Sequence, residues 1–104
     1  MRSAGKRVSP VSRKGVRYEV VAGGKGRGLG QNGGLIAAVD EASGAELWVL
    51  KVYEVHYDGD MEDDKQDVLI TGLSLGWFGN RLTVRNERGQ SFEVDLDSRQ
   101  VSAK

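Results

Sequence analysis

The chain has 104 residues, no cysteine, and 15 basic residues balanced by 15 acidic ones, so its formal net charge is zero. This length fits one domain, the lack of cysteine excludes disulfides and thiolate zinc sites, and the zero net charge excludes a globally basic nucleic-acid binder. No stretch approaches the roughly 20 apolar residues that span a bilayer, and no apolar run follows the basic start, so the sequence predicts a cytoplasmic protein without a membrane partner.

The charges are nevertheless segregated along the chain. Eight basic residues and one acidic residue lie between Arg2 and Arg27, whereas seven acidic residues and one basic residue lie between Glu54 and Asp67. Opposite charges separated in this way favour either self-association or a charged partner. The sequence leaves open whether that partner is a protein or a nucleic acid.

The first third of the chain contains one predicted strand. The segments before and after it show no periodic spacing of apolar residues. Residues 1–15 are polar and basic, and they predict a flexible basic arm. Val16 to Val20 alternate apolar and polar side chains, which is typical of a half-buried strand. Residues 23–34 form a glycine-rich loop, and ordering so many glycines costs backbone entropy. We therefore expect this loop to be mobile or to become ordered on a partner.

The middle of the chain predicts a hairpin and a long strand. The apolar run of residues 35–39 is followed by a polar turn that ends at Gly44, and then by the longest predicted strand, residues 46–57. This strand is apolar on both faces at first and on one face later, so we expect it to run from the core toward an edge. Residues 58–67 then form an acidic loop.

Three strands of alternating pattern follow toward the C-terminus. They cover residues 68–75, 81–85 and 91–96 and are separated by turns, so they predict a three-strand meander. The side chains expected to point outward from the last two strands are those of Arg81, Thr83, Arg85, Ser91, Glu93 and Asp95. Residues 16–101 are thus predicted to form a single β domain, with residues 102–104 as a tail.

A strand–turn–strand unit occurs twice, at an offset of 45 residues. Residues 39–48 and 84–93 each begin with valine, pass through a polar turn that ends at Gly44 or Gly89, and carry a bulky apolar residue three positions later. Glycine suits such a turn because it adopts the left-handed backbone conformation without steric cost. No segment shows a helical apolar stripe. The sequence therefore predicts an all-β fold with little helix, a small antiparallel barrel or sandwich of about six strands.

The first copy of this unit carries a further pattern. Ala38-Val39-Asp40 ends a strand, Ser43-Gly44 completes the turn, and Glu46-Leu47-Trp48 opens the next strand. In this respect residues 35–48 resemble the tryptophan-docking repeat of quinoprotein-type β-propellers. The resemblance implies that Trp48 packs between neighbouring blades, although the chain could supply little more than one blade of the four or more that a propeller typically needs. The second copy lacks the aspartate and the tryptophan, and no quinone-binding residue has a counterpart here.

Two local patterns could in principle bind a cofactor or a metal ion. The glycines of residues 28–33 have the spacing of a dinucleotide-binding loop, but a strand follows them where that loop requires a helix, so we expect no cofactor. His56, Asp58 and Asp60 alternate at the end of the long predicted strand and are weak candidate ligands for a divalent cation such as Ca²⁺. Their surroundings do not fit a calcium-binding loop, so we expect a solvated acidic loop without metal.

Basic residues form the stronger candidate set. Arg13, Lys14, Arg17, Lys25 and Arg27, in the arm, the first strand and the glycine-rich loop, are candidates for binding an anion or the phosphate backbone of a nucleic acid. A nucleic-acid binder would also stack bases on exposed aromatic rings. The candidate rings are those of Tyr18, Trp48, Tyr53, Tyr57 and Trp77.

No arrangement of residues predicts a reaction. Cysteine is absent, His56 is the only histidine, and no spacing singles out a pair of carboxylates for acid–base work. We therefore predict a non-catalytic binding or protein-interaction module without catalytic residues, whose partner is an unknown protein or a second copy of the chain. Nucleic-acid binding through the basic N-terminal arm and the glycine-rich loop is the alternative.

Overall fold

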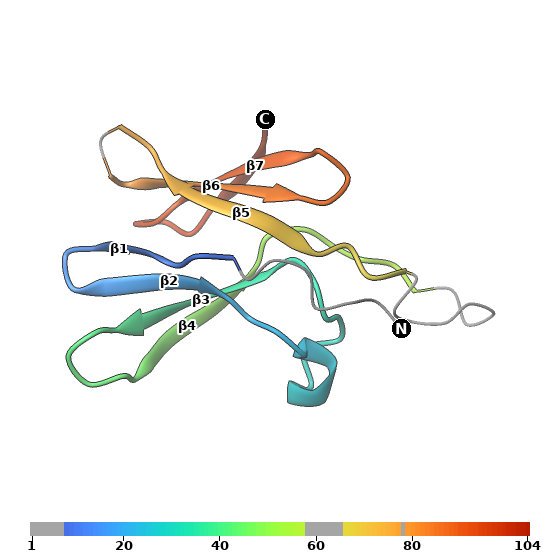
Figure 1. Ribbon diagram of the computed structural model, residues 1–104, viewed down its shortest axis with the longest axis horizontal. Helices are drawn as coiled ribbons and strands as arrows, with labels where there is room; N and C mark the ends of the chain where they lie inside the picture. The colour runs from blue at the N-terminus through green and yellow to red at the C-terminus, as the bar shows by residue number, and fades with distance from the viewer. Residues whose placement is uncertain (1–7, 58–65, 78) are drawn as a thin grey trace.

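Two four-stranded antiparallel sheets face one another in the computed structural model, which describes residues 8–57, 66–77 and 79–104 (Figure 1). The first sheet contains β1 (Val11–Arg13), β2 (Val16–Val20), β3 (Leu35–Asp40) and β4 (Glu46–Lys51). The second sheet contains β5 (Ile70–Leu75), β6 (Arg81–Asn86), β7 (Ser91–Asp95) and β8 (Val101–Ala103). Within each sheet the strands pair in the order in which they follow one another along the chain, so both sheets are meanders. The all-β prediction is confirmed, and the architecture is a sandwich and not a closed barrel.

The described part holds eight strands, two more than the sequence predicted. The additional strands, β1 and β8, have three residues each and lie at sheet edges. A strand of this length is too short to show an alternating pattern. For this reason the sequence assigned Val11–Arg13 to the flexible arm and ended the domain before residue 102. With β8, the predicted C-terminal meander of three strands has four. Residues 1–7 of the predicted arm lie outside the described residues.

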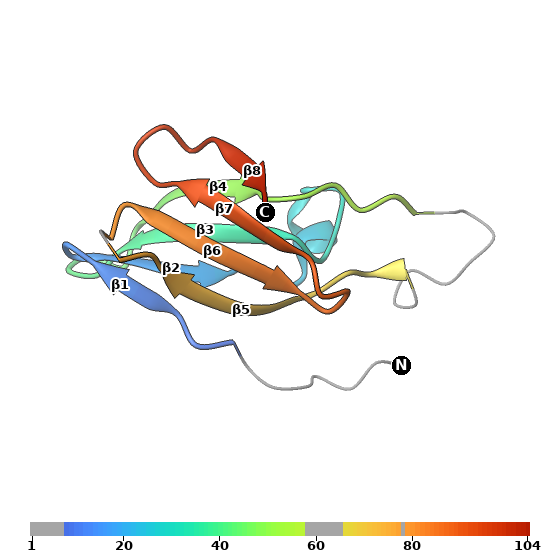
Figure 2. The ribbon, with the colours of Figure 1, turned by 90° about the horizontal axis from the view of Figure 1, so that it is seen from above.

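The facing sides of the two sheets form the main core. The fully buried side chains of this core, with no exposed surface, are those of Ile36, Ala38, Leu82, Val84 and Val94. Figure 2 shows the strands of the second sheet crossing those of the first obliquely, as is usual where two twisted sheets pack face to face. Burial of the apolar inner faces is the main force that holds the two layers together.

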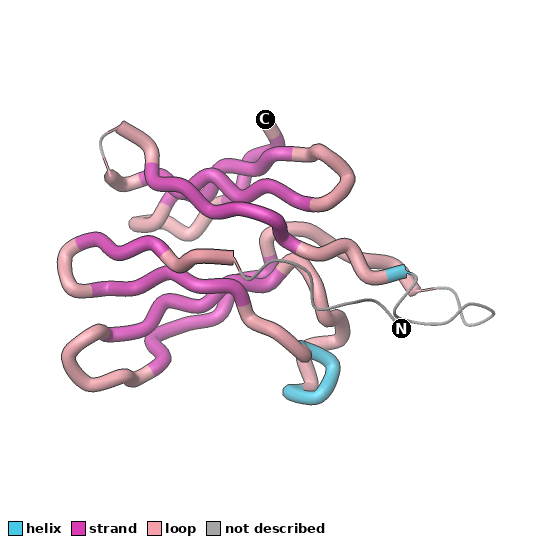
Figure 3. The backbone as a smooth tube through the Cα atoms, in the orientation of Figure 1, coloured by secondary structure: helices cyan, strands magenta, loops and turns pink. Residues whose placement is uncertain are grey.

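The first sheet is covered on its outer face as well. The side chains of this second buried cluster are those of Val21, Leu35, Ala37 and Val39. Leu29, from the glycine-rich loop, packs against them. The same loop forms the short 3₁₀ helix η1 (Gly24–Arg27), which lies below the first sheet in Figure 3. β3 is consequently buried on both faces, which agrees with its unbroken apolar run.

The long strand predicted over residues 46–57 ends at Lys51. The Val52 N–H donates to the Gly34 carbonyl at 2.7 Å, and the chain then leaves the sheet. At residues 53–57 buried or half-buried side chains still alternate with exposed ones, so the alternation continues without a strand ladder. The strand prediction is wrong beyond Lys51 because alternation indicates burial on one side of an extended chain and does not require a paired neighbour.

Both copies of the repeated unit form hairpins, as predicted. Gly44 ends the turn between β3 and β4 with φ at 76°, and Gly89 ends the turn between β6 and β7 with φ at 77°. Both values lie in the left-handed region, where a side chain on Cβ meets steric resistance. The glycine positions seen in the sequence therefore have a direct conformational cause.

A third turn, between β7 and β8, copies the turn between β3 and β4 at an offset of 55 residues. In each turn an aspartate carboxylate accepts the backbone N–H of a serine three positions later, at 3.3 Å from Ser43 to Asp40 and at 3.1 Å from Ser98 to Asp95. The bond from Ser98 helps to hold the pKa of the Asp95 carboxyl below its usual value. Arg99 stands at the glycine position, with φ at 63°, so the glycine pattern alone does not reveal this copy.

The hairpin between β1 and β2 predicts a stabilising substitution. Its two loop residues, Lys14 and Gly15, have φ values of 51° and 78°, as a type I′ turn requires. Asparagine tolerates this backbone better than lysine because its short polar side chain bonds locally. We expect Lys14→Asn to raise the free energy of unfolding by about 0.5 kcal/mol, measured by chemical denaturation.

Lys14→Gln is the matched control, because it removes the same charge without favouring a positive φ. It should leave the unfolding midpoint unchanged. An equal gain from both substitutions would mean that the charge of Lys14, and not its backbone conformation, limits stability.

Candidate functional site

The five cations predicted to bind anions do not lie on one surface. Arg13 ends β1, and Lys14 lies in the loop that follows it. Arg17 lies on the outer face of the first sheet, where its Nε donates to the Glu19 carboxylate at 3.0 Å. Arg13 and Lys14 therefore remain together in one hairpin, whereas Arg17 is bonded to an acid two residues along its own strand.

The two cations of the glycine-rich loop also contact groups of their own chain. Arg27 Nη2 donates to Glu46 Oε1 at 2.6 Å, and this bond and the charge of Glu46 raise the pKa of the Arg27 guanidinium. Arg27 and Glu46 line a groove on the outer face of the first sheet, together with Arg17 and Glu19. Lys25 lies elsewhere, with its Nζ 3.6 Å from the centre of the Tyr57 ring.

The glycine-rich loop is held in place by a buried glutamine. The Gln31 side chain is 2% exposed. Its Nε2 donates to the Gly33 carbonyl at 2.7 Å and to the Tyr53 carbonyl at 2.8 Å, and its Oε1 accepts the Val55 N–H at 3.1 Å. The sequence led us to expect a mobile or partner-ordered loop, but this network within the chain orders it. The sequence analysis did not consider Gln31, whose amide group can donate and accept hydrogen bonds as the backbone of a neighbouring strand does.

A second set of polar contacts joins the glycine-rich loop to the chain on both sides of the acidic segment. Asn32 N–H donates to the Tyr57 hydroxyl at 3.1 Å, and Asn32 Nδ2 donates to Asp67 Oδ2 at 3.4 Å. The Tyr57 hydroxyl donates to Asp67 Oδ1, and the Asn32 side chain accepts the Lys25 N–H at 3.1 Å. The glycine-rich loop thus contacts Tyr57, which precedes the predicted acidic loop of residues 58–67, and Asp67, which ends it. The contact is a polar network of the Asn32, Tyr57 and Asp67 side chains, of which only that of Asp67 is an acid.

Among the glycines of residues 28–33, Gly33 has a packing role, whereas Gly28 and Gly30 have positive φ values and open space around them. As the sequence predicts, β3 follows them where a dinucleotide-binding loop would have a helix. A Cβ built on Gly33 would lie 2.1 Å from the Val68 carbonyl oxygen, which is far closer than any real contact. By contrast, nothing lies within 4 Å of a Cβ built on Gly26, whose φ is not positive.

These two glycines provide a matched test of the packing role. We expect Gly33→Ala to lower the free energy of unfolding by about 2 kcal/mol or more, because the backbone must separate to admit a methyl group. Gly26→Ala should change it by less than about 1 kcal/mol in either direction. Thermal or chemical unfolding measures both. Equal effects would contradict the close approach of Gly33 to Val68.

The proposed metal ligands can be placed only in part. His56 is exposed, and Asp58 and Asp60 lie outside the described residues. Within residues 8–57, 66–77 and 79–104, no group of three histidine, aspartate or glutamate side chains is arranged to hold a metal ion.

The aromatic candidates divide by exposure. Tyr18 is buried, and Trp48 packs with its ring centre 5.9 Å from that of Tyr18 and 5.8 Å from the Arg99 guanidinium. Tyr53 stacks on Phe92 at 5.1 Å and donates its hydroxyl to the Val68 carbonyl at 2.6 Å, and burial raises its pKa to about 12. Tyr57 belongs to the polar network above. Trp77, in the turn between β5 and β6, is 96% exposed and presents its whole ring. The propeller-like role suggested for Trp48 stays a prediction.

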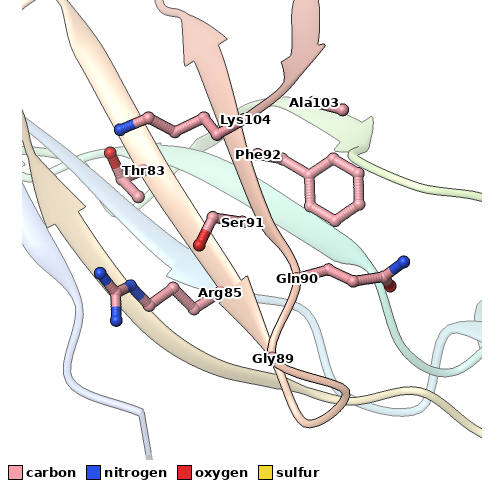
Figure 4. A pocket seen from close by; sticks show the side chains of 8 residues that line it. All are labelled: Thr83, Arg85, Gly89, Gln90, Ser91, Phe92, Ala103 and Lys104. Atoms are coloured by element: carbon pink, nitrogen blue, oxygen red, sulfur yellow. The ribbon is translucent and has the colours of Figure 1, made fainter.

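The outer face of the second sheet carries a groove of about 590 Å³ (Figure 4). The residues that line it are Thr83, Arg85, Gly89, Gln90, Ser91, Phe92, Ala103 and Lys104. It lies over β6, β7 and the end of β8, away from the core. The sequence predicted that Thr83, Arg85 and Ser91 point outward, but it did not name them as a site. Lys104 was assigned to a tail, and only the pairing of β8 with β7 brings it to the groove.

Comparison with models of known protein families found no match for this chain, and comparison with curated protein sequences found none either. In the part of the chain that the structure describes, no helix has the length and apolar character to cross a membrane.

Proposed function

We propose that this protein is a non-catalytic interaction module that binds by adding a strand of another polypeptide to the outer edge of β4. The observation that carries the proposal is the position of β4 at the end of the first sheet, with Leu47 53% exposed. β3 pairs with one side of β4, and no strand of the described residues pairs with the other. An unpaired strand edge presents a row of backbone donors and acceptors that a further strand can use.

The other three strand edges are less suited to this role. β1 and β8 have three residues each, which offer few backbone groups. β5 has six residues, but the part of it that lies beyond the irregularity, residues 72–75, begins with a glycine, which is unfavourable in a strand. In β4 the irregularity falls beside its first residues, opposite Ala38 and Val39, and leaves Trp48 to Lys51 regular. Short strands, bulges and glycines all disfavour edge pairing, and residues 48–51 of β4 contain neither a bulge nor a glycine.

A second copy of the chain is the first partner to consider. Val49 and Lys51 lie opposite Ala37 and Leu35, so both point to the outer face of the first sheet. A twofold axis through the pairing of Val49 with Val49 of the second copy keeps the same face outward in both copies. Lys51 of one copy then lies opposite Leu47 of the other, beside Glu46. This register sets no like charges directly opposite one another, so it is compatible with self-association.

Self-pairing through β4 predicts a concentration-dependent size. Sedimentation velocity across a concentration series should reveal a monomer–dimer equilibrium in the wild-type chain. Leu47→Lys should raise the dimer dissociation constant at least tenfold, about 1.4 kcal/mol, because it sets a second ammonium opposite Lys51 at both symmetry-related positions.

Thr71→Lys, an exposed residue of β5 at the edge of the second sheet, is the matched control and should leave the dissociation constant unchanged. A chain that is monomeric at every concentration, or that responds equally to both substitutions, would contradict pairing through β4.

Nucleic-acid binding is the second candidate, and one contact favours it. The Arg13 side chain lies against the turn between β5 and β6, because a Cβ built on Gly79 would be 3.4 Å from Arg13 Nε. That turn carries the exposed ring of Trp77. Two hairpin tips thus bring cations and an exposed aromatic ring to the same end of the molecule. Proteins that bind single-stranded nucleic acids combine such groups.

Titration of the full chain with a single-stranded oligonucleotide tests this candidate. Binding should weaken with salt, with a slope of about −1.4 in log K against log salt if Arg13 and Lys14 neutralise two phosphates. Trp77→Ala should weaken it about tenfold through lost base stacking. Arg88→Gln, in the turn between β6 and β7, removes a charge at the opposite end of the sandwich and should have no effect. Binding that does not depend on Trp77 would reject the site.

A further inference from the structure

We infer that the outer face of the second sheet carries a binding site for a phosphoryl group, held between Arg85 and Lys104 above Ser91. This inference is independent of strand addition at β4, which lies in the other sheet. It rests on the register of three neighbouring strands, on the charge around them, and on the groove that they line.

The register places the two cations on either side of a serine. Ser91 of β7 pairs with Arg85 of β6. On its other side, the Ser91 carbonyl accepts the Lys104 N–H at 2.9 Å, one position beyond the pairing of Phe92 with Ala103. Neighbouring strands lie about 4.8 Å apart, so Ser91 lies midway between two cationic residues whose backbones are about 10 Å apart. Figure 4 shows the side chains of Arg85, Lys104 and Thr83 extending toward the same side of the sheet.

The same row of residues leaves space for a ligand. Gly72 of β5 pairs with Arg85 on the side away from Ser91. Nothing lies within 4 Å of a Cβ built on Gly72, so this end of the row is open. Gly89 at the rim of the groove likewise adds no side chain. An anion can therefore approach the Arg85 guanidinium from the solvent without displacing another side chain.

The charges on this face leave the two cations available. Arg85 forms no ion pair within the described residues, in contrast to Arg17 and Arg27 on the first sheet. Lys104 Nζ lies 4.0 Å from Glu93 Oε2, at the limit of an ion pair. The other Glu93 oxygen accepts Arg81 Nη1 at 2.7 Å, so Lys104 shares this carboxylate with a closer cation.

The donor set suits a tetrahedral dianion better than a single carboxylate. Arg85 offers a planar fork of N–H donors, Lys104 offers an ammonium, and the Ser91 hydroxyl lies between them. The Thr83 hydroxyl lines the groove one row further along the sheet, opposite Glu93. Two cations and two hydroxyls match the charge and oxygen count of a phosphate. The Glu93 carboxylate, opposite Thr83 in the next row of the sheet, repels an anion there and favours a position nearer Ser91 and Gly89.

The experiment is a titration of the full-length chain with inorganic phosphate, followed by ¹H–¹⁵N NMR at constant ionic strength with chloride as the balancing anion. We expect saturable shifts with a millimolar dissociation constant at the amides of residues 83, 85, 89–91 and 104. The double variant Arg85→Gln/Lys104→Gln should weaken binding at least tenfold. Arg17→Gln, an outward arginine on a strand of the first sheet, is the matched control and should bind as the wild type does.

A variant that we expect to bind phosphate more tightly distinguishes loss of the site from loss of the fold. Glu93→Gln removes the carboxylate that competes for Lys104, and it should tighten phosphate binding severalfold. A second titration, with O-phospho-L-serine, distinguishes a phosphomonoester ligand, which binds tighter than inorganic phosphate, from the free ion, which binds as well or better. Shifts that do not saturate, or that are equal in the wild-type chain and the Arg85/Lys104 double variant, would overturn the assignment.

Discussion

The buried amide of Gln31 is the interaction on which the rest of the first sheet depends. Its three hydrogen bonds replace the strand neighbour that residues 53–55 lack, and they fix the glycine-rich loop at the same time. Buried backbone groups without partners are costly, so the chain beyond β4 could not leave the sheet without such a substitute. Because the loop is held there, Leu29 covers the outer cluster of β3. One side chain thus links loop order, the end of β4 and the double burial of β3.

The end of β4 has consequences for association. Since the chain leaves the sheet after Lys51, no described strand follows β4 along its outer edge. Of the other three edge strands, β1 and β8 are short, and β5 has an irregular register and contains Gly72. Such features are common where edge pairing is disfavoured. The glycine-rich loop covers the outer face of the first sheet: its hydrogen bonds run to residues 53, 55, 57 and 67, and its Arg27 bonds to Glu46 of β4 on that face. The glycine-rich loop can therefore be held in place while the outer edge of β4 stays available to another strand.

The two outer faces differ in how their charges are arranged. On the first sheet each arginine that lines the groove is bonded to a glutamate, so the groove there is nearly neutral. On the second sheet Glu93 is shared between Arg81 and Lys104, and Arg85 has no ion pair with an acid of the described residues. The zero net charge of the chain conceals this difference. The local excess of charge, and not the net charge, decides where an anion can bind. The reason is that salt screens exposed charges beyond a Debye length of about 10 Å.

The sequence by itself determined the all-β class, both glycine turns and the outward direction of Thr83, Arg85 and Ser91, because these follow from local alternation and from the steric freedom of Gly44 and Gly89. Only the tertiary structure decided that the layers form a sandwich, that Gln31 orders the glycine-rich loop, and that β1 and β8 exist as strands. It also decided that Lys104 lies beside Ser91 while Arg17 and Arg27 are bonded to acids. These features depend on contacts between residues far apart in the chain or on strands of three residues, neither of which leaves a period in the sequence.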